Sequence, residues 1–243
     1  MTEGEGVWSL YTPALAGGEL RRMADPAFYV QDFVREALRP WPDNRTLTIA
    51  CHGHSVPAGY FATPHIDTFA AYPHLWLRRL KERFPWALIN VVTTAIGGEH
   101  AERGAARFAS DVLALRPDII TIDYGLNDRE LGLRRARVAW ERMIAEAREA
   151  RATVILLTPT WDAWDGRQHR LRDDALTAHA RLIRDLAISA DVGLADAYAA
   201  FERATAAGVD VATLLSWPNH PNRRGHELVT DELMRWIPLA LPG

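Results

Sequence analysis

Short apolar runs recur along the chain and are separated by longer stretches with helical spacing of apolar residues. The runs cover residues 47–51, 87–92, 119–124, 153–158 and, with a weaker pattern, 192–195. Each run is too short for a helix and is rich in β-branched residues. We therefore predict five buried strands.

The intervals between the runs carry apolar residues three and four positions apart, as on one face of a helix. These stripes consist of Phe108, Val112 and Leu115; Trp140, Met143, Ile144 and Ala147; Leu176, Ala180, Ile183 and Ala187; and Val229, Leu233, Trp236 and Ile237. Strands that alternate with amphipathic helices are typical of a parallel sheet covered by helices on both faces. The pattern predicts an α/β fold with three layers, α/β/α, around a central and mostly parallel sheet.

The first 45 residues fit this alternation less well. Asp25 and Pro26 form an N-cap and first-turn pair, which predicts a helix through about Leu38. The Pro-Trp-Pro sequence at 40–42 ends that helix. We expect residues 1–45 to form an arm that packs on or extends a single domain spanning residues 46–243. Capping of the core, covering of a sheet edge and support of a dimer are its three open roles.

Composition narrows the class of protein. Hydrophobic residues make up 48% of 243 residues, so a substantial core is expected. Lys plus Arg number 28 and Asp plus Glu number 31, a formal net charge of -3, so neither nucleic acid nor an anionic membrane is an expected partner. A single cysteine, Cys51, excludes an intramolecular disulfide. With no apolar run of membrane-spanning length and no signal-like start, we expect a cytoplasmic protein; a homo-oligomer is compatible with the sequence.

Ligands of open parallel sheets bind at the carboxyl ends of the strands. The segments that follow the predicted strands are His52-Gly53-His54-Ser55, Ala95-Ile96-Gly97-Gly98, Gly125-Leu126-Asn127-Asp128 and Pro159-Thr160-Trp161-Asp162, and Asn219-His220-Pro221-Asn222 precedes the last helix. Because these segments converge at one edge of the sheet, their side chains are candidates for a shared site.

Four of these residues have complementary chemistry. Ser55 follows a strand and a glycine, so its hydroxyl is a candidate nucleophile, and His220 is a candidate base that could activate it. An oxyanion formed by acyl transfer needs hydrogen-bond donors. Gly98 can supply a backbone N–H, Asn127 a side-chain amide, and Ser55 its own N–H.

The same segments resemble the motifs of the SGNH (GDSL-type) hydrolases, a family named for its serine, glycine, asparagine and histidine. The matching motifs are Gly53-His54-Ser55-Val56-Pro57-Ala58-Gly59, Ile96-Gly97-Gly98-Glu99, Gly125-Leu126-Asn127-Asp128 and His220-Pro221-Asn222 followed by Gly225-His226. Their order and spacing agree with the family from about Leu47 to Ile237. The resemblance implies a flavodoxin-like sheet of five parallel strands, ester hydrolysis and no cofactor.

Two positions depart from the family pattern. His54 stands where the family usually has aspartate, a mainly structural position, so we expect altered hydrogen bonding in this loop. Trp217 stands three residues before His220, where the family has its acid. The orienting carboxylate is therefore missing from its usual place. Three outcomes are open: another carboxylate substitutes, a backbone carbonyl holds His220, or the activity is weak.

Plainer interpretations accompany each candidate. Ser55 could cap the following helix, Gly97 and Gly98 could only permit a tight turn, and His220 could be a loop residue without a role. Asn127 and Asp128 could form a turn or cap; for Asp128 we favour a structural role. His179 and His226 are expected in packing, and His226 could also support a residue of the site.

Two further groups bear on substrate and metal. His52 and His54 have His-x-His spacing, with His65 and Asp67 downstream, which is a weak signal for a metal site. Trp161 and Trp164 lie in a polar loop and could stack on sugar faces or pack beneath that loop. In the favoured interpretation Trp161, Trp164 and His54 bind substrate, and no metal is bound.

We therefore expect a serine esterase that acts on small acyl esters, including acetylated carbohydrates, through an acyl-enzyme. Ser55 and His220 would carry the proton transfer and attack, with Gly98 and Asn127 stabilising the oxyanion. The alternatives are a weakly active or inactive protein of the same fold that binds a carbohydrate or metabolite, and a metal-dependent hydrolase that uses His52 and His54.

Overall fold

The computed structural model describes residues 24–162, 174–217 and 219–238. Five parallel strands form the central sheet: β1 (Thr46–Gly53), β2 (Leu88–Thr93), β3 (Ile119–Asp123), β4 (Thr153–Leu157) and β5 (Gly193–Ala195). Their order is β2-β1-β3-β4-β5. The predicted α/β fold and its parallel sheet are confirmed, and each apolar run coincides with a strand to within two residues.

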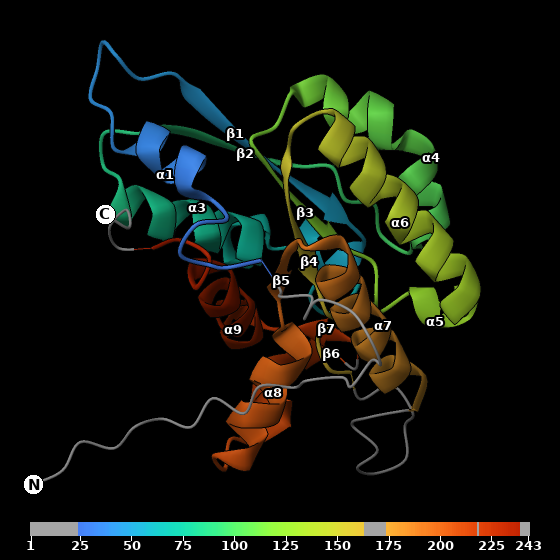
Figure 1. The fold of residues 1–243 in the computed structure, drawn as a ribbon. Coiled ribbons are helices and arrows are strands. Elements are labelled where there is room, and N and C mark those ends of the chain that lie inside the picture. Colours follow the sequence, from blue (N-terminus) through green and yellow to red (C-terminus); the bar gives the residue numbers. More distant parts are fainter. Residues whose placement is uncertain (1–23, 163–173, 218, 239–243) are drawn as a thin grey trace, which may run out of the picture.

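Helices cover both faces of this sheet. The described α-helices are α1 (Gln31–Ala37), α2 (Ser55–Ala58), α3 (Tyr72–Arg83), α4 (Ala101–Asp111), α5 (Asp128–Leu131), α6 (Leu133–Glu149), α7 (Asp174–Ala190), α8 (Ala197–Ala206) and α9 (Arg223–Met234). Figure 1 shows α4, α6 and α7 on one side of the sheet and α1, α3 and α9 on the other. Three short 3-10 helices, residues 68–70, 113–115 and 211–214, complete the described helical segments.

The two faces of the sheet bury separate apolar cores. On β1, Leu47 and Ile49 pack in the core that contains Trp76 of α3, whereas Ala50 packs in the core that contains Trp140 of α6. Alternate residues of a strand point to opposite faces, which explains this division. Burial on both faces accounts for the continuous apolar runs in the sequence.

The amino-terminal helix is shorter than the sequence predicts. It begins at Gln31 instead of Pro26, and residues 26–30 form turns. The backbone N–H groups of Phe28 and Tyr29 both bind the Asp25 carbonyl, and the Tyr29 hydroxyl donates to the Val154 carbonyl at 2.8 Å. This bond to β4 holds the chain in a turn, so a tertiary contact overrides the local helix signal.

Two short antiparallel strands, β6 (Leu215–Trp217) and β7 (His220–Pro221), form a separate hairpin that the sequence did not predict. The hairpin directly precedes α9 and carries His220. Because β1 lies between β2 and β3, the segments that follow these three strands are neighbours at one edge of the sheet. This arrangement brings the loops of Gly98 and Asn127 to either side of Ser55.

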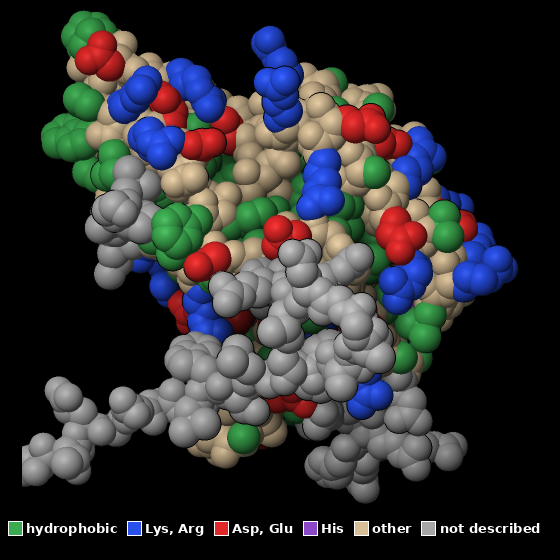
Figure 2. Space-filling view, viewed as in Figure 1, with side chains coloured by type: hydrophobic (Ala, Val, Ile, Leu, Met, Phe, Trp, Pro, Cys, Tyr) green, Lys and Arg blue, Asp and Glu red, His purple; other side chains and the backbone are tan. Residues whose placement is uncertain are grey.

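On the face in Figure 2, Lys and Arg are interspersed with Asp and Glu, and neither sign of charge forms a large continuous patch. This agrees with the formal net charge of -3. Among the described residues, no helix is both long enough and apolar enough to cross a membrane.

Candidate active site

Ser55 and His220 are brought together although 165 positions separate them in the chain. The Ser55 Oγ lies 2.9 Å from the His220 Nε2, and both side chains are buried. Ser55 is the first residue of α2, directly after β1, and His220 lies on the β6–β7 hairpin. A hydroxyl at this distance from an imidazole can pass its proton to the ring when it attacks an electrophile.

The second ring nitrogen of His220 faces a backbone carbonyl. Its Nδ1 lies 2.8 Å from the Phe61 carbonyl oxygen. A carbonyl only accepts hydrogen bonds, so Nδ1 carries the ring hydrogen and donates it to Phe61. The Nε2 then presents its lone pair to the Ser55 hydroxyl, which is the tautomer that a general base requires.

The carbonyl therefore occupies the side of His220 at which serine hydrolases usually place a carboxylate. Trp217 belongs to β6 through its backbone, and its side chain lies outside the described residues. Burial lowers the pKa of His220 below its ordinary value of 6.5, and the hydrogen bond to Phe61 opposes that shift only in part. The base is thus neutral over a wider range of pH than an exposed histidine.

The loop that carries Phe61 is closed by its own backbone. Asp67 N donates to Gly59 O at 2.8 Å, and Phe61 N donates to His65 O at 2.9 Å. Gly59 starts the loop with a φ of 87°, a conformation that favours glycine. The Phe61 ring packs on His226, with ring centroids 5.4 Å apart. These contacts fix the carbonyl that orients His220.

Two groups of this loop, the Tyr60 ring and the Phe61 carbonyl, were not assigned from the sequence. Tyr60 lies beside His220, with ring centroids 6.0 Å apart, and an added Cβ at Gly97 would lie 3.0 Å from the Tyr60 ring. Tyr60 therefore forms a wall between the base and the glycine segment. Its position five residues after the serine is the only sequence signal, and it is a weak one. The Phe61 carbonyl has no side-chain signal at all.

The glycine segment is anchored from behind by Glu99. Arg107 Nε donates to Glu99 Oε1 at 2.9 Å, and the Tyr124 hydroxyl donates to Glu99 Oε2 at 2.8 Å. Gly98 is exposed and has a φ of 74°. Its backbone N–H belongs to a turn that Glu99 N closes by donating to Ile96 O at 3.2 Å.

Asn127 is anchored to the same turn. Its Nδ2 donates to the Glu99 carbonyl at 2.9 Å, which uses one of the two amide hydrogens. Asn127 precedes α5, yet its side chain makes no capping bond. The second amide hydrogen is therefore available as a donor to an oxyanion.

Asp128 has structural contacts. Its Oδ1 accepts from Ala101 N at 2.8 Å, at the start of α4, and its Oδ2 accepts from Trp140 Nε1 at 2.7 Å. Burial raises the pKa of Asp128 to about 6. The side chain ties α5 to α4 and α6 and thereby holds the loop that carries Asn127.

His54, assigned to substrate binding from sequence, is buried, and its Nδ1 accepts from Val56 N at 3.1 Å. This bond caps α2, so capping falls to His54 and not to Ser55. His52 is also buried; its ring lies 2.8 Å from Thr94 Oγ1 and 3.0 Å from the Tyr124 hydroxyl. Among the described residues, no group of three or more His, Cys, Asp or Glu could hold a metal ion.

The described contacts of Trp161 are packing contacts. Its side chain is 3% exposed and lies against Tyr198 and Phe201, with ring centroids 5.9 and 6.3 Å apart. Of the two alternatives for Trp161, these contacts favour packing beneath the loop. Trp164 lies outside the described residues.

Two further histidines are buried, as expected for packing residues. His179 is 2% exposed and lies in α7. His226 in α9 is fully buried, and its Nδ1 accepts from Tyr72 N at 3.2 Å. Because His226 also supports the Phe61 ring, it contributes to the shape of the loop beside His220.

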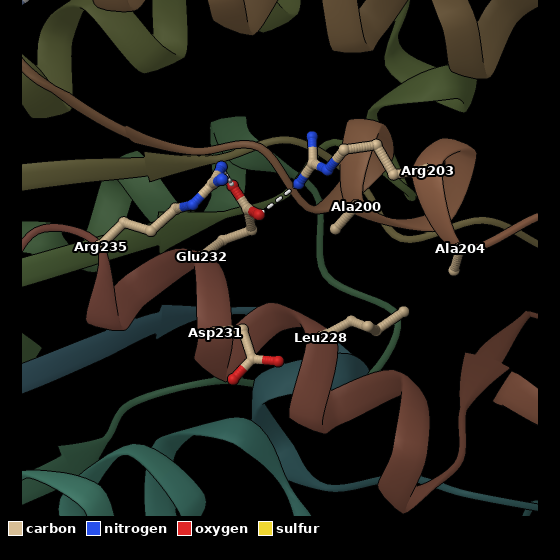
Figure 3. A pocket seen from close by; sticks show the side chains of 7 residues that line it. All are labelled: Ala200, Arg203, Ala204, Leu228, Asp231, Glu232 and Arg235. Atoms are coloured by element: carbon tan, nitrogen blue, oxygen red, sulfur yellow. Dashed lines mark hydrogen bonds and ion pairs between the residues drawn. The ribbon is translucent and has the colours of Figure 1, made fainter. Parts of the chain in front are cut away.

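A cavity of about 320 Å³ lies between α8 and α9 and does not include Ser55 or His220. Figure 3 shows Glu232 there between Arg203 and Arg235, and both arginines pair with it. Asp231 also lines this cavity, and it pairs with Arg79 of α3 at 2.9 Å.

Similar solved structures include an acetylxylan esterase from Geobacillus stearothermophilus, with a TM-score of 0.67 and 22% identity over 79% of this chain and 94% of that one. An α/β hydrolase enzyme from the metagenome of Lake Arreo, Spain, has a TM-score of 0.65 and 22% identity over 78% and 94% of the two chains. At these identities the likeness is one of fold. No curated protein sequence matches this chain.

The sequence profile of the GDSL-like Lipase/Acylhydrolase family matches residues 51–228. This span starts within β1, contains Ser55, Gly98, Asn127 and His220, and ends within α9. The chain therefore belongs to the GDSL-like lipase/acylhydrolase family.

Proposed function

We propose that this protein is a serine hydrolase of carboxylic esters that works with a Ser55–His220 dyad. The observation that carries this proposal is the 2.9 Å contact between Ser55 Oγ and His220 Nε2, with Nδ1 held by the Phe61 carbonyl. The family match supports an activity on esters. No step of this chemistry requires a cofactor.

In the first step the Ser55 oxygen attacks the ester carbonyl carbon while its proton passes to His220 Nε2. The backbone N–H groups of Ser55 and Gly98 and the Asn127 amide then stabilise the tetrahedral oxyanion. Its collapse releases the alcohol, which takes the proton from His220, and leaves an acyl group on Ser55. Water, activated by His220, releases the acid and restores the serine.

The Phe61 carbonyl performs one of the two roles that a carboxylate would have beside His220. It fixes the tautomer of His220, whose loss alone can cost about four orders of magnitude in a serine hydrolase. It supplies a dipole but no full charge, so the imidazolium that forms is less stabilised than beside a carboxylate. The expected result is an active but slow esterase.

For substrates we propose small acyl esters, with acetylated carbohydrates as the class to test first. The similar structures include acetylxylan esterases, and their names are the support for acetyl groups on sugars. The packing of Trp161 gives no additional support for sugar binding.

Labelling with a serine-directed fluorophosphonate tests the proposal, together with rates on acetyl, butyryl and octanoyl esters of p-nitrophenol and on acetylated xylooligosaccharides. The wild type should become labelled at Ser55 and hydrolyse the shorter esters. Ser55→Ala should lose both properties, whereas Ser110→Ala, an exposed serine of α4, should keep them. Absence of labelling and of turnover in a folded wild type would contradict the proposal and favour a binding protein of this fold.

A further inference from the structure

Two of the proposed oxyanion donors are tied to the main chain of one residue, Glu99. Asn127 Nδ2 donates to the Glu99 carbonyl at 2.9 Å. Glu99 N donates to Ile96 O at 3.2 Å and thereby closes the turn that contains Gly98. Neither bond uses the Glu99 carboxylate. A shift of the Glu99 main chain would therefore move the Gly98 N–H and the Asn127 amide together.

The Glu99 carboxylate is buried, and Arg107 of α4 is its charge partner. Arg107 Nε donates to the two carboxylate oxygens at 2.9 and 3.1 Å, and its Nη2 donates to Oε2 as well. Asp111, one turn further along α4, holds the guanidinium from the other end through Nη1 at 3.1 Å. A planar guanidinium that makes several bonds to one carboxylate fixes the position and the orientation of that carboxylate.

A chain of hydrogen bonds holds the same carboxylate from a second side. The Tyr124 hydroxyl donates to Glu99 Oε2 at 2.8 Å and lies 3.0 Å from His52 Nε2. His52 Nε2 also faces the Gly104 carbonyl, which only accepts, so Nε2 carries the ring hydrogen and Nδ1 accepts from Thr94 Oγ1 at 2.8 Å. Burial lowers the pKa of His52 to about 4, which agrees with a neutral ring. An added Cβ at Gly104 would collide with the Tyr124 hydroxyl, so this approach needs glycine.

We propose that the Arg107–Glu99 pair is a positioning device for the oxyanion site. Arg107 keeps the Glu99 carboxylate in its buried place. The main chain of Glu99 then holds the Gly98 N–H and the Asn127 amide where the oxyanion forms. Both members of the pair are positioning residues, because they act through these two donors. The inference rests on the proposed function, since it concerns how the donors of the same site are held.

Loss of Arg107 would leave the buried carboxylate beside the neutral Tyr124 hydroxyl and without its charge partner. A buried charge that has lost its partner is strongly unfavourable, so Glu99 would move towards water or take up a proton. Either response changes the place of Glu99 between Gly98 and the start of α4. Oxyanion donors act only over a short range, and a displacement of about 1 Å can cost roughly 100-fold in rate.

A pair of matched arginine variants separates positioning from a general loss of stability. Arg107→Met should lower kcat by roughly 10- to 100-fold and change KM by less than about 3-fold, and Arg107→Lys, which keeps the charge but not the planar fork, should lose less. Arg184→Met is the control, because Arg184 also donates twice to one carboxylate, that of Asp196, at 2.7 and 3.0 Å. Asp196 follows β5, at the opposite edge of the sheet from β2, so this variant should lower Tm and keep the wild-type kcat.

An equal loss of kcat in Arg107→Met and Arg184→Met, or a change in KM alone, would overturn the proposal. If Arg107→Met does not fold, Arg107→Lys and Arg184→Lys decide by the same comparison.

A second readout needs no activity. The ¹⁵N–¹H signals of the Gly98 backbone and the Asn127 side-chain amide, assigned with Gly98→Ala and Asn127→Ala, should shift in the Arg107 variant and stay in the Arg184 variant. Unchanged signals in the Arg107 variant would overturn the proposal. A wild type that binds no fluorophosphonate and hydrolyses no ester contradicts the proposed function, and the amide signals still decide whether Arg107 positions these two groups.

Discussion

Removal of the Asn127 amide provides the sharpest test of the oxyanion site. One amide hydrogen is used by the Glu99 carbonyl at 2.9 Å, so the second is the one side-chain donor among the three donors that we assign. Loss of one such donor typically lowers kcat by about 100- to 1000-fold, or about 2.7–4 kcal/mol of transition-state stabilisation. The ground-state ester gains little from the donor, so KM should change by less than roughly 3-fold.

Asn127→Ala also removes the bond to Glu99, which should cost about 1 kcal/mol of folding free energy and roughly 2–4 °C in Tm. Asn44→Ala is a matched control, because the Asn44 amide also donates to a backbone carbonyl, that of Trp86 at 3.1 Å. Asn44 precedes β1 and therefore lies at the opposite end of that strand from Ser55.

The assay is steady-state hydrolysis of a p-nitrophenyl ester, with Tm measured for each variant. Asn44→Ala should keep the wild-type kcat, and Asn127→Ala should not. The reasoning would be refuted if Asn127→Ala raised only KM, or if its kcat fell no further than that of Asn44→Ala. The rate of fluorophosphonate labelling should fall together with kcat, because the phosphonate oxygen uses the same donors.

Three further outcomes are expected. The neutral form of His220 is the active base, and burial lowers its pKa, so activity should persist below pH 6.5 and be lost only as the pH falls through the lowered value. The pH profile of kcat/KM and an NMR titration of the ring test this. An acidic limb above pH 6.5 would indicate a carboxylate that faces His220. Trp161→Ala should lower the free energy of unfolding, measured by chemical denaturation, by about 3–5 kcal/mol, because the side chain is 3% exposed. A decrease below about 1 kcal/mol would contradict a packing role for Trp161. Gly98→Ala keeps the N–H but adds a side chain at a φ of 74°, which strains the turn and shifts the donor, so it should lower kcat well beyond its effect on Tm. Gly208→Ala, which has a similar φ of 88° and equally open space, should affect Tm alone. Parallel effects of the two changes would contradict the assignment of Gly98 to the oxyanion site.

The sheet could be predicted because burial on both faces produces an uninterrupted apolar run. In β3, all five residues from Ile119 to Asp123 are buried. The start of α1 could not be predicted, because the bond between Tyr29 and Val154 joins residues 125 positions apart. Local capping signals at Asp25 carry no information about such a contact.

The candidate site was also predictable only in part. Ser55 and His220 were expected to meet because their side-chain chemistry and their motif positions are both visible in the sequence. The Phe61 carbonyl was foreseen only as one of three open outcomes and without a residue, since every residue has such an oxygen. Its selection depends on the path of the loop from Gly59 to Asp67, which follows from folding and not from residue type.

This reliance on a main-chain oxygen makes the orientation of the base insensitive to side-chain chemistry. No point substitution can delete the Phe61 carbonyl, whereas a carboxylate is lost in a single change. The orientation of His220 depends instead on the local stability of the loop, which a few backbone hydrogen bonds hold closed. Segments of this kind can open at a lower free energy than the whole protein. Mild heat or a low concentration of urea should therefore abolish the activity reversibly while the central sheet is still folded.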